Sequence, residues 1–161
     1  GMLTAPITVE DIFLGEILWA SSKGFFFALA ALGVAMAAGI IREPLALLTP
    51  IVGFLTGFLF AALSLWVTTL VKTIQHFNFY FSGILSPMFF FSGVVFPLNQ
   101  LPHFLRPLAE ILPLTHAVRL SRDLCSGKIS WMLAIDTAAM ICFGLLFTYW
   151  AIHRLKKKLI H

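Results

Sequence analysis

Charged residues are scarce in this sequence. Aspartate, glutamate, lysine and arginine together make up only 11% of its 161 residues, whereas hydrophobic residues make up 60% and the mean hydropathy is +0.96. An ordinary soluble domain carries about a quarter charged residues. The composition therefore excludes a water-soluble globular protein and predicts a chain that lies mostly in a membrane.

The sequence also lacks a catalytic motif. Residues 127–129 read Gly-Lys-Ile, and no glycine stands at the earlier position that a Walker A loop requires, so the chain cannot hydrolyse a nucleotide by itself. His103, His116 and Cys125 share one segment, but their spacing is not that of zinc ligands. The only other cysteine is Cys142, and two cysteines are too few for a disulfide framework. We predict a protein that is not an enzyme and binds no metal.

Four apolar runs are long enough to cross a bilayer, which takes about 17–25 residues of helix. They cover residues 24–41, 45–71, 77–98 and 129–152. Each run is continuously apolar, whereas a strand of a membrane barrel would alternate between polar and apolar residues over about ten positions. We therefore predict an all-α, polytopic membrane protein with four transmembrane helices in a single membrane domain, 1–161.

Residues 1–17 differ from the runs that follow them. Thr8 and Asp11 have the spacing of a capping box, which predicts a helix that starts near Val9 with Glu10 in its first turn. Apolar residues recur at helical spacing between the acids, as in a helix that lies on a membrane surface. We predict a short cytoplasmic amphipathic helix here, and the alternative is an N-terminal extension of the first transmembrane helix.

Positive charge is concentrated near the C-terminus. Four of the eleven lysines and arginines lie in the last eight residues, at Arg154 and 156–158. A net charge of +4 placed in this way indicates a cytoplasmic anchor rather than a surface for nucleic acid. With 153–161 as a basic cytoplasmic tail and four spans, both termini are predicted to be cytoplasmic.

Residues 99–128 join the third and fourth runs and are too apolar for an aqueous loop. Three prolines break this segment into short pieces. Thr115 can cap a second helix over 116–125, with Gly127 as its stop. We predict a re-entrant helical hairpin beside the functional pathway, because irregular backbone at membrane depth must be covered by protein or water. A surface-lying amphipathic loop is the alternative.

Asp136 is the only acid within the four runs. A charge near the bilayer centre costs about 2.5–3.5 kcal/mol on the insertion scale, so this carboxylate needs a partner or a polar cavity. It lies only about 10 Å of helix rise from the start of its run. It can therefore pair with Arg119 or Arg122 near the outer surface, and a role in transport is the alternative.

Small residues predict that helices approach each other closely. Gly53 and Gly57 form a GxxxG pair in the second run, and positions 33/37 and 35/39 hold further small pairs in the first. These pairs indicate that helices pack closely but do not identify which helices meet. The phenylalanine triplets 25–27 and 89–91 are expected to face lipid, and a lining for an amphiphilic substrate is the alternative.

The most specific motif begins at the end of the third run. Residues 91–102 read Phe-Ser-Gly-Val-Val-Phe-Pro-Leu-Asn-Gln-Leu-Pro, and the pattern continues through 112–117 to Arg119 and Arg122. Together with two N-terminal segments within 3–19, it resembles the ABC-2 type permeases, and among them those of the nodulation lipo-oligosaccharide exporter type. The order of predicted helices agrees with this resemblance.

The resemblance implies an integral membrane subunit of an ATP-driven exporter in the bacterial cytoplasmic (inner) membrane. Two permease copies would form the pathway as a homodimer. A separate nucleotide-binding ATPase subunit would hold ATP and Mg, so that no cofactor belongs to this chain. The substrate would be amphiphilic, such as a lipo-oligosaccharide, a polysaccharide or a drug. Such permeases have six spans and the sequence resembles their last two-thirds, so we expect it to insert but not to transport on its own. Because two helices would be missing, we also expect the GxxxG face at Gly53 and Gly57 to meet lipid or a non-native partner.

The resemblance also implies two functional surfaces. The N-terminal helix would be the coupling helix received by the ATPase, with a coupling surface at Pro6, Thr8, Glu10, Asp11, Gly15 and Glu16. The broken segment would form the outer gate, with Phe91, Gly93, Phe96, Pro97, Leu101, Pro102, Pro113, His116, Arg119 and Arg122. Two other functions remain open: an ATPase-independent secondary carrier that uses Asp136, and a non-transporting membrane interaction protein.

Overall fold

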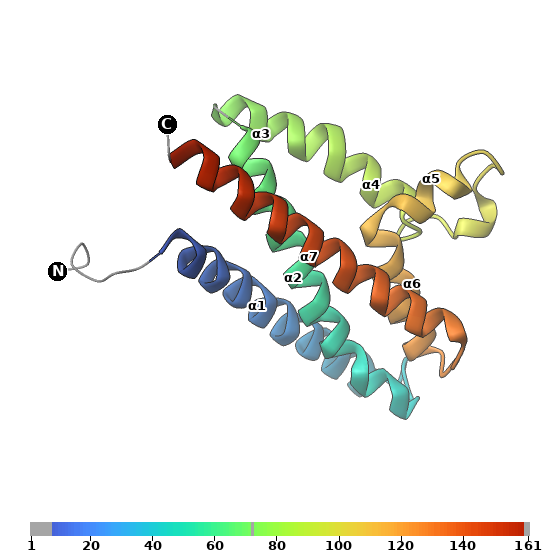
Figure 1. The fold of residues 1–161 in the computed structure, drawn as a ribbon. Coiled ribbons are helices and arrows are strands. Elements are labelled where there is room, and N and C mark those ends of the chain that lie inside the picture. The colour runs from blue at the N-terminus through green and yellow to red at the C-terminus, as the bar shows by residue number, and fades with distance from the viewer. Residues whose placement is uncertain (1–7, 72, 160–161) are drawn as a thin grey trace.

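The computed structural model describes residues 8–71 and 73–159. Helices joined by turns make up these residues, with no strand among them, which confirms the all-α class (Figure 1). In chain order the elements are α1 (Val9–Ala37), the 3-10 helix η2 (Pro44–Leu48), α2 (Thr49–Leu70), α3 (Ile74–Tyr80), the π-helix η3 (Phe81–Leu85), α4 (Ser86–Phe91), the 3-10 helix η4 (Leu98–Gln100), α5 (Arg106–Ile111), α6 (Pro113–Cys125) and α7 (Trp131–Leu159).

Three helices within the described residues are long and apolar enough to cross a membrane. They cover Val9–Ala37, Pro44–Leu70 and Trp131–Lys157, and correspond to the first, second and fourth predicted spans. The third predicted span, 77–98, is not among them, because three short elements divide it. The predicted count of four spans is therefore not confirmed.

A proline explains how the third predicted span is divided. Pro87 has no N–H to donate to the carbonyl four residues earlier, and its ring crowds that turn. The backbone widens into the π-helix η3, after which the Ser86 N–H bonds to the Phe81 carbonyl, five residues earlier. Elements α3, η3 and α4 still follow one another as a single rod (Figure 1). The rod ends at Phe91, so the last residues of the predicted span lie in a turn.

Helix α1 runs without a break for 29 residues. The capping box at its start is present, with the Thr8 hydroxyl accepting from the Asp11 N–H and the Asp11 carboxylate accepting from the Thr8 N–H at 2.9 Å. The prediction of a separate amphipathic helix over 1–17 is wrong. The alternative, an extension of the first span, is correct from Val9 onward. No proline stands between Val9 and Ala37, so nothing interrupts the hydrogen bonds of the helix.

Helix α7 also continues further than predicted. It ends at Leu159, so residues 153–159 form its last turns rather than a separate basic tail. Lysine, arginine and leucine are good helix formers, and no glycine or proline occurs there to end the helix. Residues 160–161 lie outside the described part of the chain.

Glycines set the contact between α1 and α2. A Cβ atom on Gly53 would lie 2.5 Å from the Gly24 carbonyl oxygen, and one on Gly57 would lie 2.7 Å from the Ala20 carbonyl oxygen. No side chain fits at these distances, so the GxxxG pair lets the two backbones touch. This face therefore has its partner within the chain, contrary to expectation. A Cβ on Gly33 would have no neighbour within 4 Å, so that predicted face is not the one used.

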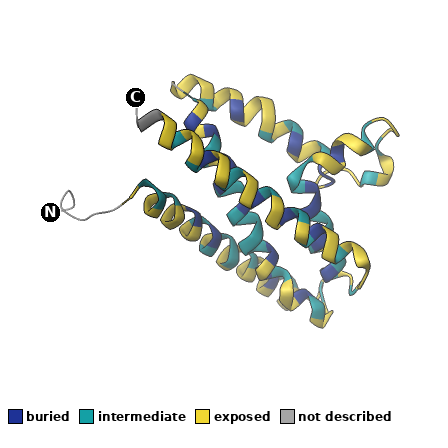
Figure 2. Ribbon diagram, viewed as in Figure 1, coloured by how far each residue is buried: buried dark blue, intermediate teal, exposed yellow. Residues whose placement is uncertain are grey.

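The largest cluster of buried residues lies where α2, α6 and α7 meet (Figure 2). It consists of Val52, Leu59, Ala117, Leu120, Leu124 and Met140. Helix α6 enters this cluster through residues spaced three and four apart, so it packs into the bundle along one face. By contrast, Phe26 and Phe27 of α1 are 66% and 74% exposed, as expected for side chains that face lipid.

The start of α1 and the end of α7 lie at the same end of the bundle (Figure 1). Lys156 of α7 forms an ion pair with Glu10 of α1 there. At the opposite end, the α1–α2 turn reaches the α6–α7 turn, where the Glu43 carboxylate lies close to Gly127. The start of α1 and the end of α7 are thus on one side of the bundle. That this side is cytoplasmic stays a prediction.

The two cysteines give a test of that placement. Cys125 is half-buried at the end of α6, whereas Cys142 is exposed in the middle of α7, where it would face hydrocarbon. Thiols react as thiolates, which need water. With the other cysteine replaced by serine, we expect an impermeant maleimide added to intact cells to label Cys125 much faster than Cys142. Labelling of Cys125 only after the inner side is opened would reverse the orientation.

Candidate functional site

The segment between α4 and α7 folds as two short helices, α5 and α6, joined at Leu112. Leu112 is extended, with ψ of 125°, because the residue before a proline avoids the helical region, and Pro113 then starts α6. The predicted cap at Thr115 is wrong. Its buried hydroxyl donates to the Ala109 carbonyl at 2.6 Å and so ties α6 back to α5. Two short helices are present as predicted, and their depth in the membrane stays a prediction.

A glycine with positive φ lies at each end of this segment. Gly127, with φ of +67°, follows α6, and the Lys128 N–H bonds to the Asp123 carbonyl at 2.9 Å as in a Schellman motif. Gly93, with φ of +89°, follows α4. Residues with a Cβ rarely adopt these angles. The predicted stop at Gly127 is confirmed.

A buried ion-pair network joins α5, α6 and α7. Asp136 of α7 is fully buried, and its carboxylate accepts from Arg119 Nε at 2.7 Å and Nη2 at 2.5 Å. His116 Nδ1 lies 2.8 Å from the same carboxylate. The outer edge of the Arg119 guanidinium donates to Glu110 of α5 at 2.7 and 3.0 Å. One guanidinium therefore bridges a buried acid on α7 and a half-exposed acid on α5.

The network explains how the bundle accommodates Asp136. Of the two partners predicted from the sequence, Arg119 is confirmed, whereas Arg122 donates to the Gly93 carbonyl at 2.5 Å. Paired hydrogen bonds from a charged donor offset much of the cost of burying a carboxylate. The hydrogen bond to Asp136, with a smaller effect from Glu110, raises the pKa of the Arg119 guanidinium above its already high ordinary value, so Arg119 remains charged.

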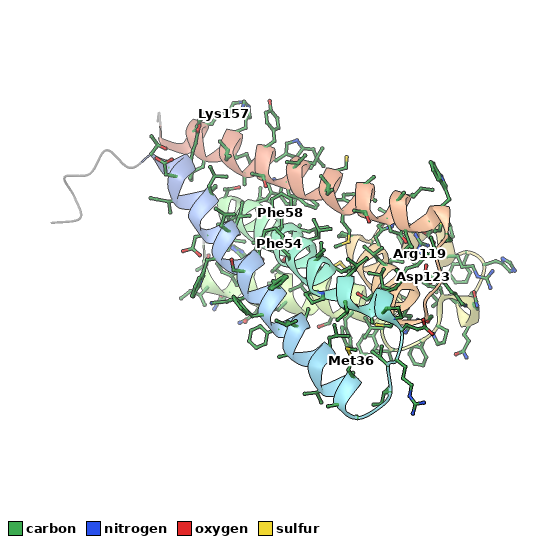
Figure 3. All side chains as sticks on the ribbon, turned by 90° about the horizontal axis from the view of Figure 1, so that it is seen from below. Met36, Phe54, Phe58, Arg119, Asp123 and Lys157 are labelled. Atoms are coloured by element: carbon green, nitrogen blue, oxygen red, sulfur yellow. The ribbon has the colours of Figure 1, made fainter. Side chains whose placement is uncertain are left out.

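A small polar cavity of about 190 Å³ lies beside the network. It is lined by Ser92, Pro97, Leu98, Asn99, Val118, Arg119, Arg122 and Asp123. Arg119 and Asp123 lie together at the end of the bundle away from Lys157 (Figure 3). The lining carries two guanidinium groups, of Arg119 and Arg122, and one carboxylate, of Asp123, so the cavity is suited to a small polar or anionic ligand. Within the described residues, no three His, Cys, Asp or Glu side chains come together to hold a metal ion.

The structure brings some predicted gate residues together and separates others. Pro97, Arg119 and Arg122 line the cavity, Gly93 accepts from Arg122, and His116 belongs to the network. The remaining residues are Phe96 and Pro102, exposed in the loop, Phe91 and Leu101, half-buried, and Pro113, at the start of α6. Their assignment to a gate stays a proposal.

The predicted coupling residues fall on the first turns of α1, at the other end of the bundle. Thr8 and Asp11 cap the helix, and Glu10 pairs with Lys156. Gly15 and Glu16 are exposed, and Glu16 forms no ion pair with another described residue. Pro6 lies outside the described residues. Gly15 and Glu16 are therefore the coupling residues most available to a partner protein.

One residue of the ion-pair network and one residue of the contact between α1 and α2 were not identified from the sequence. Glu110, the second partner of Arg119, lies on the other side of a proline break, where helical periodicity does not apply. An acid in the same segment as Arg119 and Arg122 was the available signal that a partner exists. Gly24, which meets the GxxxG pair, has small neighbours four residues away on both sides, Ala20 and Ala28, but this face was not selected.

Comparison with known proteins decides the family. The family model of the ABC-2 type transporter matches residues 2–126. This chain belongs to the ABC-2 type transporter family. The match covers every element from α1 to α6, and so includes Arg119 and Glu110, while Asp136 lies beyond it.

Two relatives of this ABC-2 type chain are both named Nodulation protein J. Nodulation protein J of Sinorhizobium fredii (strain NBRC 101917 / NGR234) is 35% identical over 158 residues, which cover 98% of this chain and 60% of that protein. Nodulation protein J of Rhizobium meliloti (strain 1021) is 32% identical over 163 residues, which cover 99% and 61%. The chain thus spans about 60% of the length of these relatives. No solved structure matches.

Proposed function

We propose that this chain is part of the permease subunit of an ATP-driven exporter, in which α5 and α6 form a cap over the outer end of the bundle. The Arg119 bridge carries this proposal, because it fastens both short helices to α7 at the end opposite the start of α1. The proposed substrate is amphiphilic, such as a lipo-oligosaccharide, a polysaccharide or a drug. Two copies would form the pathway in the bacterial inner membrane, with both termini cytoplasmic.

The start of α1 is the proposed contact for the ATPase subunit. A helix of 29 residues is about 43 Å long, whereas the hydrocarbon core is about 30 Å thick. About nine residues of α1 therefore extend beyond the hydrocarbon. The capped, acidic turns from Thr8 to Glu16 are the polar end of this helix and are the residues that suit an aqueous partner. A rigid helix that continues into the span can transmit a push from that partner.

The alternative of a carrier that uses Asp136 has less support. Both oxygens of this carboxylate are bonded, one to Arg119 Nε and the other to Arg119 Nη2 and His116. A carrier cycle through Asp136 would have to break and remake these bonds in a buried site. We therefore assign Asp136 a structural role in the proposed permease.

Reconstitution tests the proposed function. The full-length permease that contains this chain is placed in lipid vesicles with its nucleotide-binding subunit, and movement of a lipo-oligosaccharide is measured with and without ATP. We expect movement only with ATP. Movement without the ATPase subunit would support the carrier, and failure of any nucleotide-binding protein to bind would support an interaction protein.

Reversing the charge of Glu16 tests the coupling surface. Glu16→Lys changes an exposed side chain that forms no ion pair with described residues, so the bundle should keep its stability. We expect binding of the ATPase subunit to weaken about tenfold, as one unfavourable charge contact of about 1.4 kcal/mol would cause. Lys157→Gln, which removes a charge at the same end from a side chain that forms no ion pair with a described coupling residue, is the control and should leave binding nearly unchanged. Equal binding by Glu16→Lys and the unaltered chain would exclude this surface.

A further inference from the structure

One face of α7 carries a stripe of aromatic and basic residues at the end where α1 begins. Each of Trp150 and Lys157 lies three or four residues from both His153 and Arg154, which places the four side chains along one side of the helix. The stripe faces the last turns of α2, since the Trp66 and Trp150 rings lie 5.7 Å apart. Figure 3 shows Lys157 at the end of the bundle opposite Arg119.

Two adjoining cavities follow this stripe. The first, of about 400 Å³, is lined by Thr69, His153, Arg154 and Lys157. The second, of about 340 Å³, is lined by Trp66, Trp150, His153 and Arg154. Because they share His153 and Arg154, the two cavities form one groove, cationic toward the helix end and aromatic toward the middle. We refer to these six residues as the α2–α7 groove.

The positive charge of the α2–α7 groove is not neutralised within the described residues. Lys156, on another side of α7, is paired with Glu10. Neither Arg154 nor Lys157 takes part in an ion pair there, and no acid lines either cavity. Two permanent cations three residues apart on one helix favour an anionic ligand.

The tryptophans place the groove at a membrane surface. Trp131 and Trp150 of α7 are separated by about 28 Å of helix rise, close to the roughly 30 Å thickness of the hydrocarbon core. Tryptophan is enriched at both boundaries between hydrocarbon and headgroups. Arg154 and Lys157 then lie one to two turns beyond the boundary that Trp150 marks. This is the level at which lipid phosphates are found.

We propose that the α2–α7 groove binds the headgroup of an anionic phospholipid. The phosphate lies between Arg154 and Lys157, while the glycerol and the first acyl carbons lie against Trp66 and Trp150. Basic pockets between transmembrane helices are suited to such headgroups, because charge attraction adds to the burial of the lipid chain. The proposal concerns a resident lipid and is independent of the exported substrate and of the ATPase subunit.

Quenching of tryptophan fluorescence by brominated lipids tests the proposal. The full chain carries Trp19→Phe and Trp131→Phe, so that only Trp66 and Trp150 report. It is titrated in micelles with brominated phosphatidylglycerol or brominated phosphatidylcholine. We expect half-maximal quenching at an about tenfold lower mole fraction of the anionic lipid. Equal quenching by the two lipids would overturn the proposal.

Matched charge removals separate a site from general attraction. Arg154→Gln should lose most of the preference for phosphatidylglycerol, whereas Lys156→Gln, which removes the same charge two positions away, should keep it. An equal loss in both variants would mean attraction without a site and would overturn the proposal. Circular dichroism confirms that each variant is folded. Competition by millimolar inorganic phosphate or glycerol 3-phosphate would instead identify a soluble phosphate ligand and would exclude the lipid.

Discussion

Replacement of Arg119 by glutamine is expected to lower the free energy of unfolding by about 3–5 kcal/mol, the range found when one partner of a buried ion pair is removed. The change leaves the fully buried Asp136 carboxylate with only His116 beside it and removes both hydrogen bonds to the Glu110 carboxylate. Unfolding is followed by circular dichroism during titration of mixed micelles with sodium dodecyl sulfate.

The two acids of this network, Asp136 and Glu110, provide the controls. Asp136→Asn should cost about 1–3 kcal/mol, because Arg119 keeps both bonds to Glu110 and its side chain is 17% exposed to solvent. Glu110→Gln should cost less than about 1 kcal/mol, because the Glu110 side chain is 49% exposed. If Glu110→Gln were as damaging as Arg119→Gln, the buried half of the network would not be what holds α6 to α7.

Replacement of Gly53 by leucine is expected to separate α1 from α2. Its Cβ alone would lie 2.5 Å from the Gly24 carbonyl oxygen, and backbone atoms on the facing helix cannot rotate away as a side chain would. Overpacking in a filled interior costs about 1–3 kcal/mol, and a leucine between touching backbones belongs at or above the upper limit. The same titration measures the loss, and limited proteolysis of the α1–α2 turn should become faster.

Gly33→Leu is the matched control on α1. A Cβ at Gly33 would have no neighbour within 4 Å, so the leucine side chain has room to point into lipid. Leucine also favours the helix over glycine by somewhat less than about 1 kcal/mol, so stability should stay the same or rise slightly. Similar destabilisation by Gly33→Leu and Gly53→Leu would show that loss of any glycine, rather than close backbone contact, weakens the bundle.

Local chemistry was sufficient to predict the helices and several of their ends. A continuous apolar run in lipid has to satisfy its backbone groups within itself, so length and composition indicate a helix. The predicted runs 45–71 and 129–152 accordingly overlap most of α2 and α7. The start after Thr8 and the stop at Gly127 depend on hydrogen bonds within about one turn, and both are confirmed.

Predicted breaks between elements were less accurate. Amphipathic spacing shows which side of a helix is polar, but it does not show where the helix ends, and so α1 continues through the boundary predicted at residue 17. The third predicted span, which is not confirmed, was expected as one continuous helix and is divided into three elements. Pro87 signals a disturbance, yet whether the chain kinks, stops or widens into η3 depends on how the neighbouring turns can move.

Contacts between distant residues were decided by the tertiary structure. The sequence limited the partners of Asp136 to Arg119 and Arg122, but the choice of Arg119 and the addition of Glu110 depend on how α5 and α6 fold against α7. Gly24 and Gly33 are both helical glycines of α1, yet only one meets α2. The sequence by itself thus determined the helical membrane class, the family, the cap at Thr8 and the stop at Gly127, because these depend on composition, motif and neighbouring residues. Which side chains meet depends on the rotation and depth of each helix, which result from the packing of the whole bundle.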